Sequence, residues 1–292
     1  MSRPLVWNVD PVFFHFGNVS VRYYGICFGL ALVTGFLVWY RRVLRDGRSV
    51  AFGEDFLIFT VPSVIIGGRV GYCFFYAPRT YLAHPLQILA FWRGGLASHG
   101  VAIGLAVALW LFSRRHHVTW TLVGDYFAPG VALAVGWVRI GNFFNSEVLG
   151  RVTHVPWAIV FARHDNLPRH PAQLYDFMIG PITWLVLRYV ERKEIRPLGS
   201  GLIAGTFLVV YFGIRIFVET YKDFYLEELR TFGPFRVIES WVGVPIHTGQ
   251  MLSVIPVLFG VILIIRAMAM RREPVVDSPA PDSFSGAASL GL

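Results

Sequence analysis

The chain has 292 residues, of which 55% are hydrophobic and only 15% are charged. A soluble domain carries charge on about a quarter of its residues, so this composition excludes an ordinary soluble protein. The net charge of +8 could suggest a nucleic-acid partner, but the basic residues stand in short clusters between apolar runs, which is the pattern of membrane topology.

Seven mostly apolar runs are long enough to cross a hydrocarbon core, which takes about 20 helical residues. Backbone groups in lipid must be satisfied internally, and the runs show no period-two alternation, so they predict helices rather than a barrel. In chain order the runs are 19–40, 53–76, 96–113, 119–143, 171–190, 199–221 and 248–268. We therefore predict an all-α polytopic membrane protein with one transmembrane domain over residues 1–272. The segment 273–292 is rich in Pro, Ser, Ala and Gly and is predicted to be a disordered tail.

The placement of arginine and lysine predicts the orientation of these runs. The loops that follow the first, third, fifth and seventh runs are short and dense in basic residues, whereas the loops at the other end are longer and carry them sparsely. The dense loops are expected on the cytoplasmic side. The N-terminus then lies outside and the C-terminus inside.

Three arginines, Arg69, Arg139 and Arg215, fall inside the apolar runs, and this orientation places all three near the outer face. The other four runs carry polar residues at the same depth: Tyr24, His99, Gln173, Tyr175 and Gln250. A charge at the bilayer centre costs at least about 2.5–3.5 kcal/mol, so such residues are functional candidates. We expect the polar groups of all seven runs to meet in one layer.

Structural explanations stay open for some of these residues. A single arginine near a helix end can extend to the lipid headgroups. Arg215 and Glu219 are four residues apart on one helical face and could form a structural ion pair. Gly67 and Gly71 form a GxxxG step, which is typical of close helix packing and would bring Arg69 near a neighbouring helix.

The chemistry of the polar layer favours an anionic lipid. Arginines in a medium of low dielectric constant favour an anion, above all a phosphate, and at the outer leaflet the phosphates belong to lipid headgroups. Asn142 and Asn145 can orient hydroxyl or ester oxygens, and His99 has the unperturbed pKa, about 6.5, that suits proton transfer near neutrality. No activated serine or cysteine nucleophile is evident. Either a second substrate supplies the nucleophile, or the protein is not an enzyme.

The segment that carries Arg139 and Asn142 also carries a family resemblance. Val138–Arg151 reads VRIGNFFNSEVLGR and resembles the signature GRIGNFxNGExxGR of the bacterial prolipoprotein diacylglyceryl transferases. Further motifs of that family are matched along residues 11 to 272: YYG at Tyr23–Gly25, GGRVGY at Gly67–Tyr72, GGLASHG at Gly94–Gly100, RHPAQLYD at Arg169–Asp176, YFGIRIFVE at Tyr211–Glu219 and GQMLS at Gly249–Ser253.

The chain departs from the family pattern at four places. Val138 and Ser146 stand where the family has glycine, and Asp176 stands where it has glutamate. The segment Tyr221–Pro245 is longer than expected between the last two runs. None of these changes removes a charged or proton-transferring residue.

The resemblance implies transfer of the diacylglyceryl group of phosphatidylglycerol to the lipobox cysteine of a prolipoprotein, with release of glycerol phosphate. The acceptor thiol then supplies the missing nucleophile. We predict that His99 is the base or proton shuttle, that Arg139 and Arg215 hold the lipid phosphate, and that Asn142 positions the headgroup. The other predicted substrate-binding residues are Tyr24, Arg69, Asn145, Glu147 and Tyr211. Glu147 could instead brace an arginine.

The expected partners are phosphatidylglycerol, the prolipoprotein signal region and the membrane, without nucleic acid, and we expect a monomer in the bacterial inner membrane. The two cysteines, Cys27 and Cys73, show no metal-ligand spacing, so we expect neither a metal nor a cofactor. Two alternatives remain. They are a transporter or flippase for an anionic lipid or solute, and a non-catalytic lipid-binding scaffold.

Overall fold

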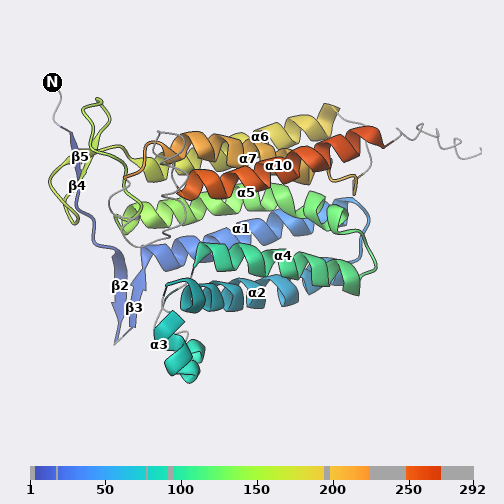
Figure 1. Ribbon diagram of the computed structural model, residues 1–292, viewed down its shortest axis with the longest axis horizontal. Coiled ribbons are helices and arrows are strands. Elements are labelled where there is room, and N and C mark those ends of the chain that lie inside the picture. Colours follow the sequence, from blue (N-terminus) through green and yellow to red (C-terminus); the bar gives the residue numbers. More distant parts are fainter. Residues whose placement is uncertain are drawn as a thin grey trace, which may run out of the picture.

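Long helices that lie side by side form the body of the molecule (Figure 1). The computed structural model describes residues 4–17, 19–76, 78–90, 95, 97–193, 198–223 and 248–270. Within these residues the long helices are α1 (Tyr23–Arg45), α2 (Val50–Tyr76), α4 (Ser98–Arg115), α5 (Trp120–Phe144), α6 (Ala172–Lys193), α7 (Leu202–Glu219) and α10 (Thr248–Ala269). Five of them, α1, α2, α5, α7 and α10, are long and apolar enough to cross a membrane.

Each of the seven predicted runs coincides with one of these helices, with boundaries that differ by a few residues. The first helix begins later than predicted because Val19–Arg22 is not helical. It forms strand β3, which pairs antiparallel with β2 (Val12–Phe16) and leads directly into α1. The fold is therefore mostly helical, with short strands that the sequence did not predict. The predicted tail 273–292 and most of the long segment 221–245 lie outside the described residues.

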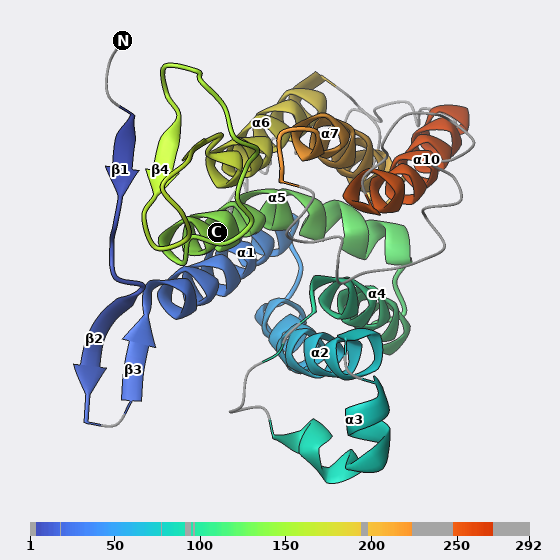
Figure 2. The ribbon, with the colours of Figure 1, turned by 60° about the vertical axis from the view of Figure 1, so that its left-hand side comes forward.

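A small sheet stands at one end of the bundle, which we call the sheet end (Figure 2). Its strands are β1 (Leu5–Trp7), β4 (Ile159–Phe161) and β5 (Pro168–Arg169), in the order β1-β4-β5. β1 runs parallel to β4, and β5 runs antiparallel to β4. The Trp7 ring lies 4.4 Å from the ring of Phe143 on α5. The N-terminal segment and the loop after α5, which are far apart in sequence, thus cover the end of α5 together.

The opposite end, which we call the base, is closed by apolar packing and by buried hydrogen bonds. Trp39 of α1 stacks on Phe56 of α2 with ring centroids 3.8 Å apart, in a cluster that also includes residues of α4 and α5. The buried carboxylate of Asp125 on α5 accepts hydrogen bonds from the amides of Gly201 (3.0 Å) and Ala204 (2.9 Å) at the start of α7. Because charged acceptors stabilise unpaired amides at a helix N-terminus, Asp125 fixes α7 to α5.

Glycines allow α2 and α4 to pack in direct backbone contact. A Cβ atom placed on Gly100 would lie 2.1 Å from the carbonyl oxygen of Gly67, and one placed on Gly71 would lie 2.6 Å from the Cα of Gly100. The predicted packing role of the GxxxG step is confirmed. This contact holds the first turn of α4, which contains His99, against the part of α2 that carries Arg69.

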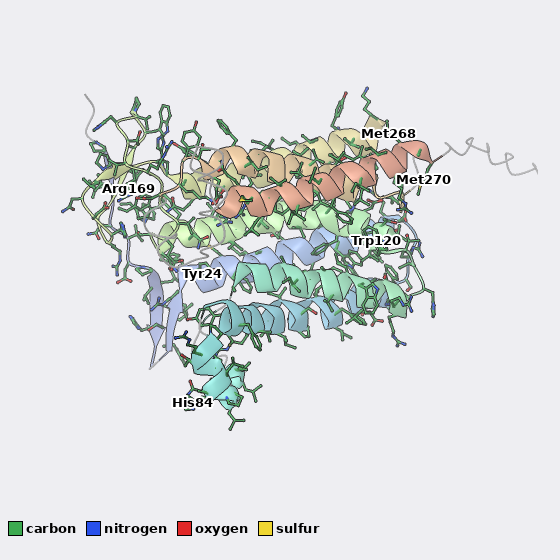
Figure 3. The ribbon with its side chains drawn as sticks, viewed as in Figure 1. Tyr24, His84, Trp120, Arg169, Met268 and Met270 are labelled. Atoms are coloured by element: carbon green, nitrogen blue, oxygen red, sulfur yellow. The ribbon has the colours of Figure 1, made fainter. Side chains whose placement is uncertain are left out.

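A short helix, α3 (Pro78–Ala83), and a 3₁₀ helix, η1 (Pro85–Leu89), follow α2 and project from the bundle (Figure 1). Figure 3 shows that Tyr24 lies toward the sheet end, where Arg169 is found, whereas Trp120 and Met268 lie toward the base. Tyr24, one of the residues of the predicted polar layer, therefore lies toward the sheet end.

Candidate functional site

The chain folds back on itself directly after α5. Ser146 and Val148 have φ angles of +54° and +55°, which lie in the left-handed region that favours glycine. The backbone amide of Glu147 donates to the carbonyl of Asn142 at 2.9 Å. The Glu147 carboxylate then lies between two amide side chains, because the Nδ2 atoms of Asn142 and Asn145 each donate to it at 3.2 Å. The turn makes one polar cluster out of three predicted site residues.

Five charged residues from α5, α6, α7 and the segment after α7 form a second cluster, which we call the ion array. The Nε atom of Arg139 lies 3.3 Å from Oδ2 of Asp176. The Nζ atom of Lys222 lies 2.9 Å from that same oxygen and 2.9 Å from Oε2 of Glu219. The Nε atom of Arg215 lies 4.0 Å from Oε2 of Glu219. The ion pair of Arg215 with Glu219, which the sequence left open as one alternative, is therefore present.

The members of the ion array differ in exposure. Asp176, Glu219 and Lys222 are at most 5% exposed, whereas the side chains of Arg139 and Arg215 are 18% and 25% exposed. Buried charges are tolerated only when they are paired, and here two carboxylates share one ammonium. Asp176, Glu219 and Lys222 are thus the buried part of the ion array, and the two guanidinium groups are its more accessible part.

Asn142 connects the two clusters. Its Oδ1 atom accepts a hydrogen bond of 3.5 Å from Nη1 of Arg139, while its Nδ2 atom donates to Glu147. These contacts fix the orientation of the amide, with the oxygen toward the arginine and the nitrogen toward the carboxylate. Glu147 thus braces Arg139 through Asn142. In addition, Gln173 on α6 donates to the Glu147 carbonyl at 2.7 Å.

The two predicted tyrosines lie in different surroundings. Tyr24 at the start of α1 packs on α5: a Cβ atom placed on Gly141 would lie 2.9 Å from the Tyr24 ring. It is therefore close to the helical turns that carry Arg139 and Asn142. Tyr211 is only 5% exposed and belongs to an apolar cluster with Ile179, its ring centroid 5.4 Å from that of Phe207.

Arg69 lies in another part of the molecule from the ion array. It is 1% exposed, donates to the carbonyls of Ile88 (2.9 Å) and Gln87 (2.7 Å), and lies over the Tyr81 ring. These contacts hold η1 against α2. Helices α1 and α5 lie between α2 and the pair α6 and α7, which carry part of the ion array (Figures 1 and 2). The backbone of His99 lies in the first turn of α4, and its side chain is outside the described part of the chain.

Sequence reasoning missed Asp176 and Lys222 as members of the site. In the sequence Asp176 stands out only as a departure from a family glutamate, and Lys222 only as a loop cation. A signal for Lys222 was present, since it follows Glu219 by three residues and is one of two lysines in the sequence. Its partner on α6 could not be found in this way, because the pairing depends on how α6 and α7 pack.

A histidine of the loop before α6 was missed as well. The Nδ1 atom of His170 lies 3.1 Å from the hydroxyl of Tyr175, which also accepts a hydrogen bond of 2.7 Å from Nε1 of Trp157. Burial lowers the pKa of His170, and the charge of Arg151 lowers it further. Both effects favour the uncharged imidazole.

The bundle of long apolar helices defines a multi-pass membrane protein. A sequence model described as "Prolipoprotein diacylglyceryl transferase" matches residues 11–266. The chain belongs to the prolipoprotein diacylglyceryl transferase family.

Several proteins named phosphatidylglycerol–prolipoprotein diacylglyceryl transferase resemble the chain over most of its length. The protein of Nitrosospira multiformis is 36% identical over 89% of this chain and 87% of its own. That of Pseudoalteromonas atlantica is 36% identical over 96% of both chains. That of Nitrosomonas europaea is 40% identical over 73% of this chain and 77% of its own.

Proposed function

We propose that this chain transfers the diacylglyceryl group of phosphatidylglycerol to the lipobox cysteine of a prolipoprotein and releases glycerol phosphate. The relatives that carry the name of this activity support the proposal over nearly the full chain. The structural observation that carries it is the ion array, in which Arg139 and Arg215 come from different helices and are each held by a buried carboxylate.

In the proposed reaction the thiol sulfur attacks the sp³ glyceryl carbon, and the bond from that carbon to the phosphate oxygen breaks. The phosphate leaves with the bonding electrons, so negative charge grows on its oxygen. Arg139 and Arg215 bind the phosphate and stabilise this charge. Removing one such preorganised donor typically costs about 2.7–4 kcal/mol of transition-state stabilisation.

The acceptor thiol must lose its proton. A free thiol has a pKa of about 8.5 and is only a few per cent thiolate at neutral pH. His99 takes the proton, and the positive field of the arginines favours the thiolate. Asn142, held by Glu147, positions the headgroup. Tyr24, Asn145 and Tyr211 are further proposed substrate contacts. Arg69 is buried against η1, away from the ion array, so its proposed contact is with another part of the substrates.

The proposed topology has seven spans, with the N-terminus outside, the C-terminus in the cytoplasm and the ion array near the outer leaflet of the bacterial inner membrane. The last turns of α1, α4, α6 and α10 carry the basic residues, as expected for cytoplasmic helix ends. Residues 1–272 form one catalytic domain followed by the tail 273–292, and the enzyme acts as a monomer.

The test uses the purified full chain in detergent with phosphatidylglycerol and a lipobox peptide. Mass spectrometry is expected to detect a peptide with a thioether-linked diacylglyceryl group, together with free glycerol phosphate. A peptide with serine in place of the lipobox cysteine is the control and should give no product. Absence of the thioether product would contradict the proposal, and anion-dependent flux in liposomes without product would favour a transporter.

A further inference from the structure

Lys222 occupies the centre of the ion array. Its ammonium lies 2.9 Å from Asp176 on α6 and 2.9 Å from Glu219 on α7, and its side chain is 5% exposed. Each of these carboxylates also faces one of the two arginines proposed to hold phosphate. Lys222 is therefore the one residue of the array that contacts both carboxylates.

The backbone of Lys222 is held in place independently of its side chain. The residue forms an antiparallel bridge with Gly150 in the loop after α5. On either side of it, the Arg151 amide donates to the Tyr221 carbonyl at 2.9 Å, and the Asp223 amide donates to the Leu149 carbonyl at 3.0 Å. The ammonium is thus not needed to fix this segment, and its burial calls for another explanation.

The choice of lysine is informative. The sequence has 26 basic residues, of which only Lys193 and Lys222 are lysines. An ammonium is a compact cation with three donors, so it can serve two carboxylates from one point, whereas a guanidinium is a planar fork that matches a single carboxylate or phosphate. The position between Asp176 and Glu219 suits a point charge.

The arginines use one edge for the carboxylates. Both contacts involve Nε, at 3.3 Å for Arg139 and 4.0 Å for Arg215. An arginine that meets a carboxylate through Nε can turn its Nη atoms toward a second acceptor, as Nη1 of Arg139 is turned toward Oδ1 of Asn142 at 3.5 Å. Without a cation between them, the two buried carboxylates would repel each other, and each would pair more closely with its arginine. The arginines would then bind a second anion less tightly.

Glu219 is confined from a second side. A Cβ atom placed on Gly249, in the first turn of α10, would lie 2.3 Å from Oε1 of Glu219. The Glu219 carboxylate therefore lies in contact with both α10 and Lys222, and it has little room to move toward Arg215.

We propose that Lys222 is a positioning residue for phosphatidylglycerol, which holds Asp176 and Glu219 so that Arg139 and Arg215 keep the spacing that one phosphate requires. The inference rests on the proposed function of the array and adds a residue that acts through the arginines rather than on the substrate. Loss of the ammonium should weaken binding of the lipid more than binding of the peptide.

The experiment measures KM for phosphatidylglycerol, KM for the lipobox peptide and kcat for purified full-length variants. Lys222→Met is expected to raise KM for the lipid by about tenfold, the lower end of the loss seen when groups that orient the ligands of a metal site are removed. The KM for the peptide should stay unchanged. Lys222→Arg keeps the charge but replaces the point-like ammonium by a planar fork, so it should recover only part of the affinity for the lipid. Lys193→Met, at the base end of α6, is the matched control and should behave as wild type.

Thermal unfolding of each variant separates this role from a structural one. A purely structural lysine would lower the unfolding temperature or the yield without a selective change in KM for the lipid. If Lys222→Met does not fold, Lys222→Gln, which keeps N–H donors but not the charge, takes its place with the same expectation. An unchanged KM for the lipid in active, folded Lys222→Met or Lys222→Gln would overturn the inference. Inactivity of the wild type would instead count against the proposed function.

Discussion

Arg169 at the end of β5 is bound to Asp165 by two hydrogen bonds to the same oxygen, of 2.6 Å from Nη2 and 2.9 Å from Nε. The same guanidinium donates to the Gly150 carbonyl at 3.0 Å. It thus ties the loop between β4 and β5 to the loop that follows α5. Arg169 is buried, so this contact is part of the support of the candidate site rather than a surface pair.

This contact makes stability depend on pH in the acid range. The Arg169 guanidinium holds the pKa of Asp165 below its ordinary value. A carboxyl whose pKa is lower in the folded state contributes stability above its unfolded pKa, about 3.9, and loses it as the pH falls through the folded value. Between pH 5 and pH 3 the unfolding temperature of the wild type should therefore fall more steeply than that of Asp165→Asn. Parallel pH profiles for the two proteins would show that the pair adds no such stability.

Ser146 is predicted to carry a conformational cost. Its φ of +54° is a region where an L-residue costs about 1–2 kcal/mol more than glycine. The Ser146 hydroxyl is buried and has no hydrogen-bond partner among the described residues, so little is lost with it. Ser146→Gly should stabilise the protein by about 0.5–1 kcal/mol, measured as a higher unfolding temperature in detergent. Ser146→Ala keeps the Cβ atom and is the control. An equal gain in both variants would refute the conformational explanation.

Asp125 is predicted to matter for stability and not for chemistry. It lies at the base, far from the ion array along α5, and its carboxylate accepts three amide hydrogen bonds, from Gly199, Gly201 and Ala204. An asparagine side chain at this position would turn an N–H group toward these donors, so Asp125→Asn should destabilise the protein by about 3 kcal/mol. Glu54→Gln, at an exposed carboxylate on α2, should change little. A wild-type unfolding temperature for Asp125→Asn would contradict this role.

His99 is predicted to act as the base. If it takes the proton of the acceptor thiol, activity rises with pH as the imidazole loses its own proton, which produces the lower limb of the pH–rate curve. His99→Gln removes that group and should flatten this limb as well as lower kcat. The measurement is kcat/KM for the lipobox peptide from pH 5 to pH 9. A variant whose curve keeps the wild-type shape would exclude His99 as the base.

The sequence predicts the helices well because each is a long apolar run with basic residues at one end. It misses the strands because they are short and their partners are distant: β1 pairs with β4 across about 150 residues of chain. The predicted first helix includes Val19–Arg22 because the two valines continue the apolar run. The pairing of this segment with β2 could not be seen from hydropathy alone.

In the candidate site, too, pairs within one helix could be predicted from the sequence, and pairs between helices could not. Arg139 and Asn142 share a helical face and could be grouped from their spacing, and so could Arg215 and Glu219. The link from Arg139 to Asp176 could not, because it depends on the packing of α6 against α5. Sequence reasoning also gave no sign that Arg69 is engaged by the carbonyls of two residues in η1. The spacing of residues along one helix is readable from a sequence, whereas the partners of a buried charge depend on tertiary structure.

In the proposed reaction, Arg139 and Arg215 hold the lipid phosphate through planar, two-point contacts. The most direct test is kcat/KM for phosphatidylglycerol in Arg215→Lys, because lysine keeps the charge and loses the fork. We expect a loss of about a hundredfold, with normal expression and a normal unfolding temperature. Arg115→Lys, an exposed arginine at the base, is the control and should keep wild-type activity. A near-wild-type rate in Arg215→Lys would show that Arg215 does not hold the phosphate in this way.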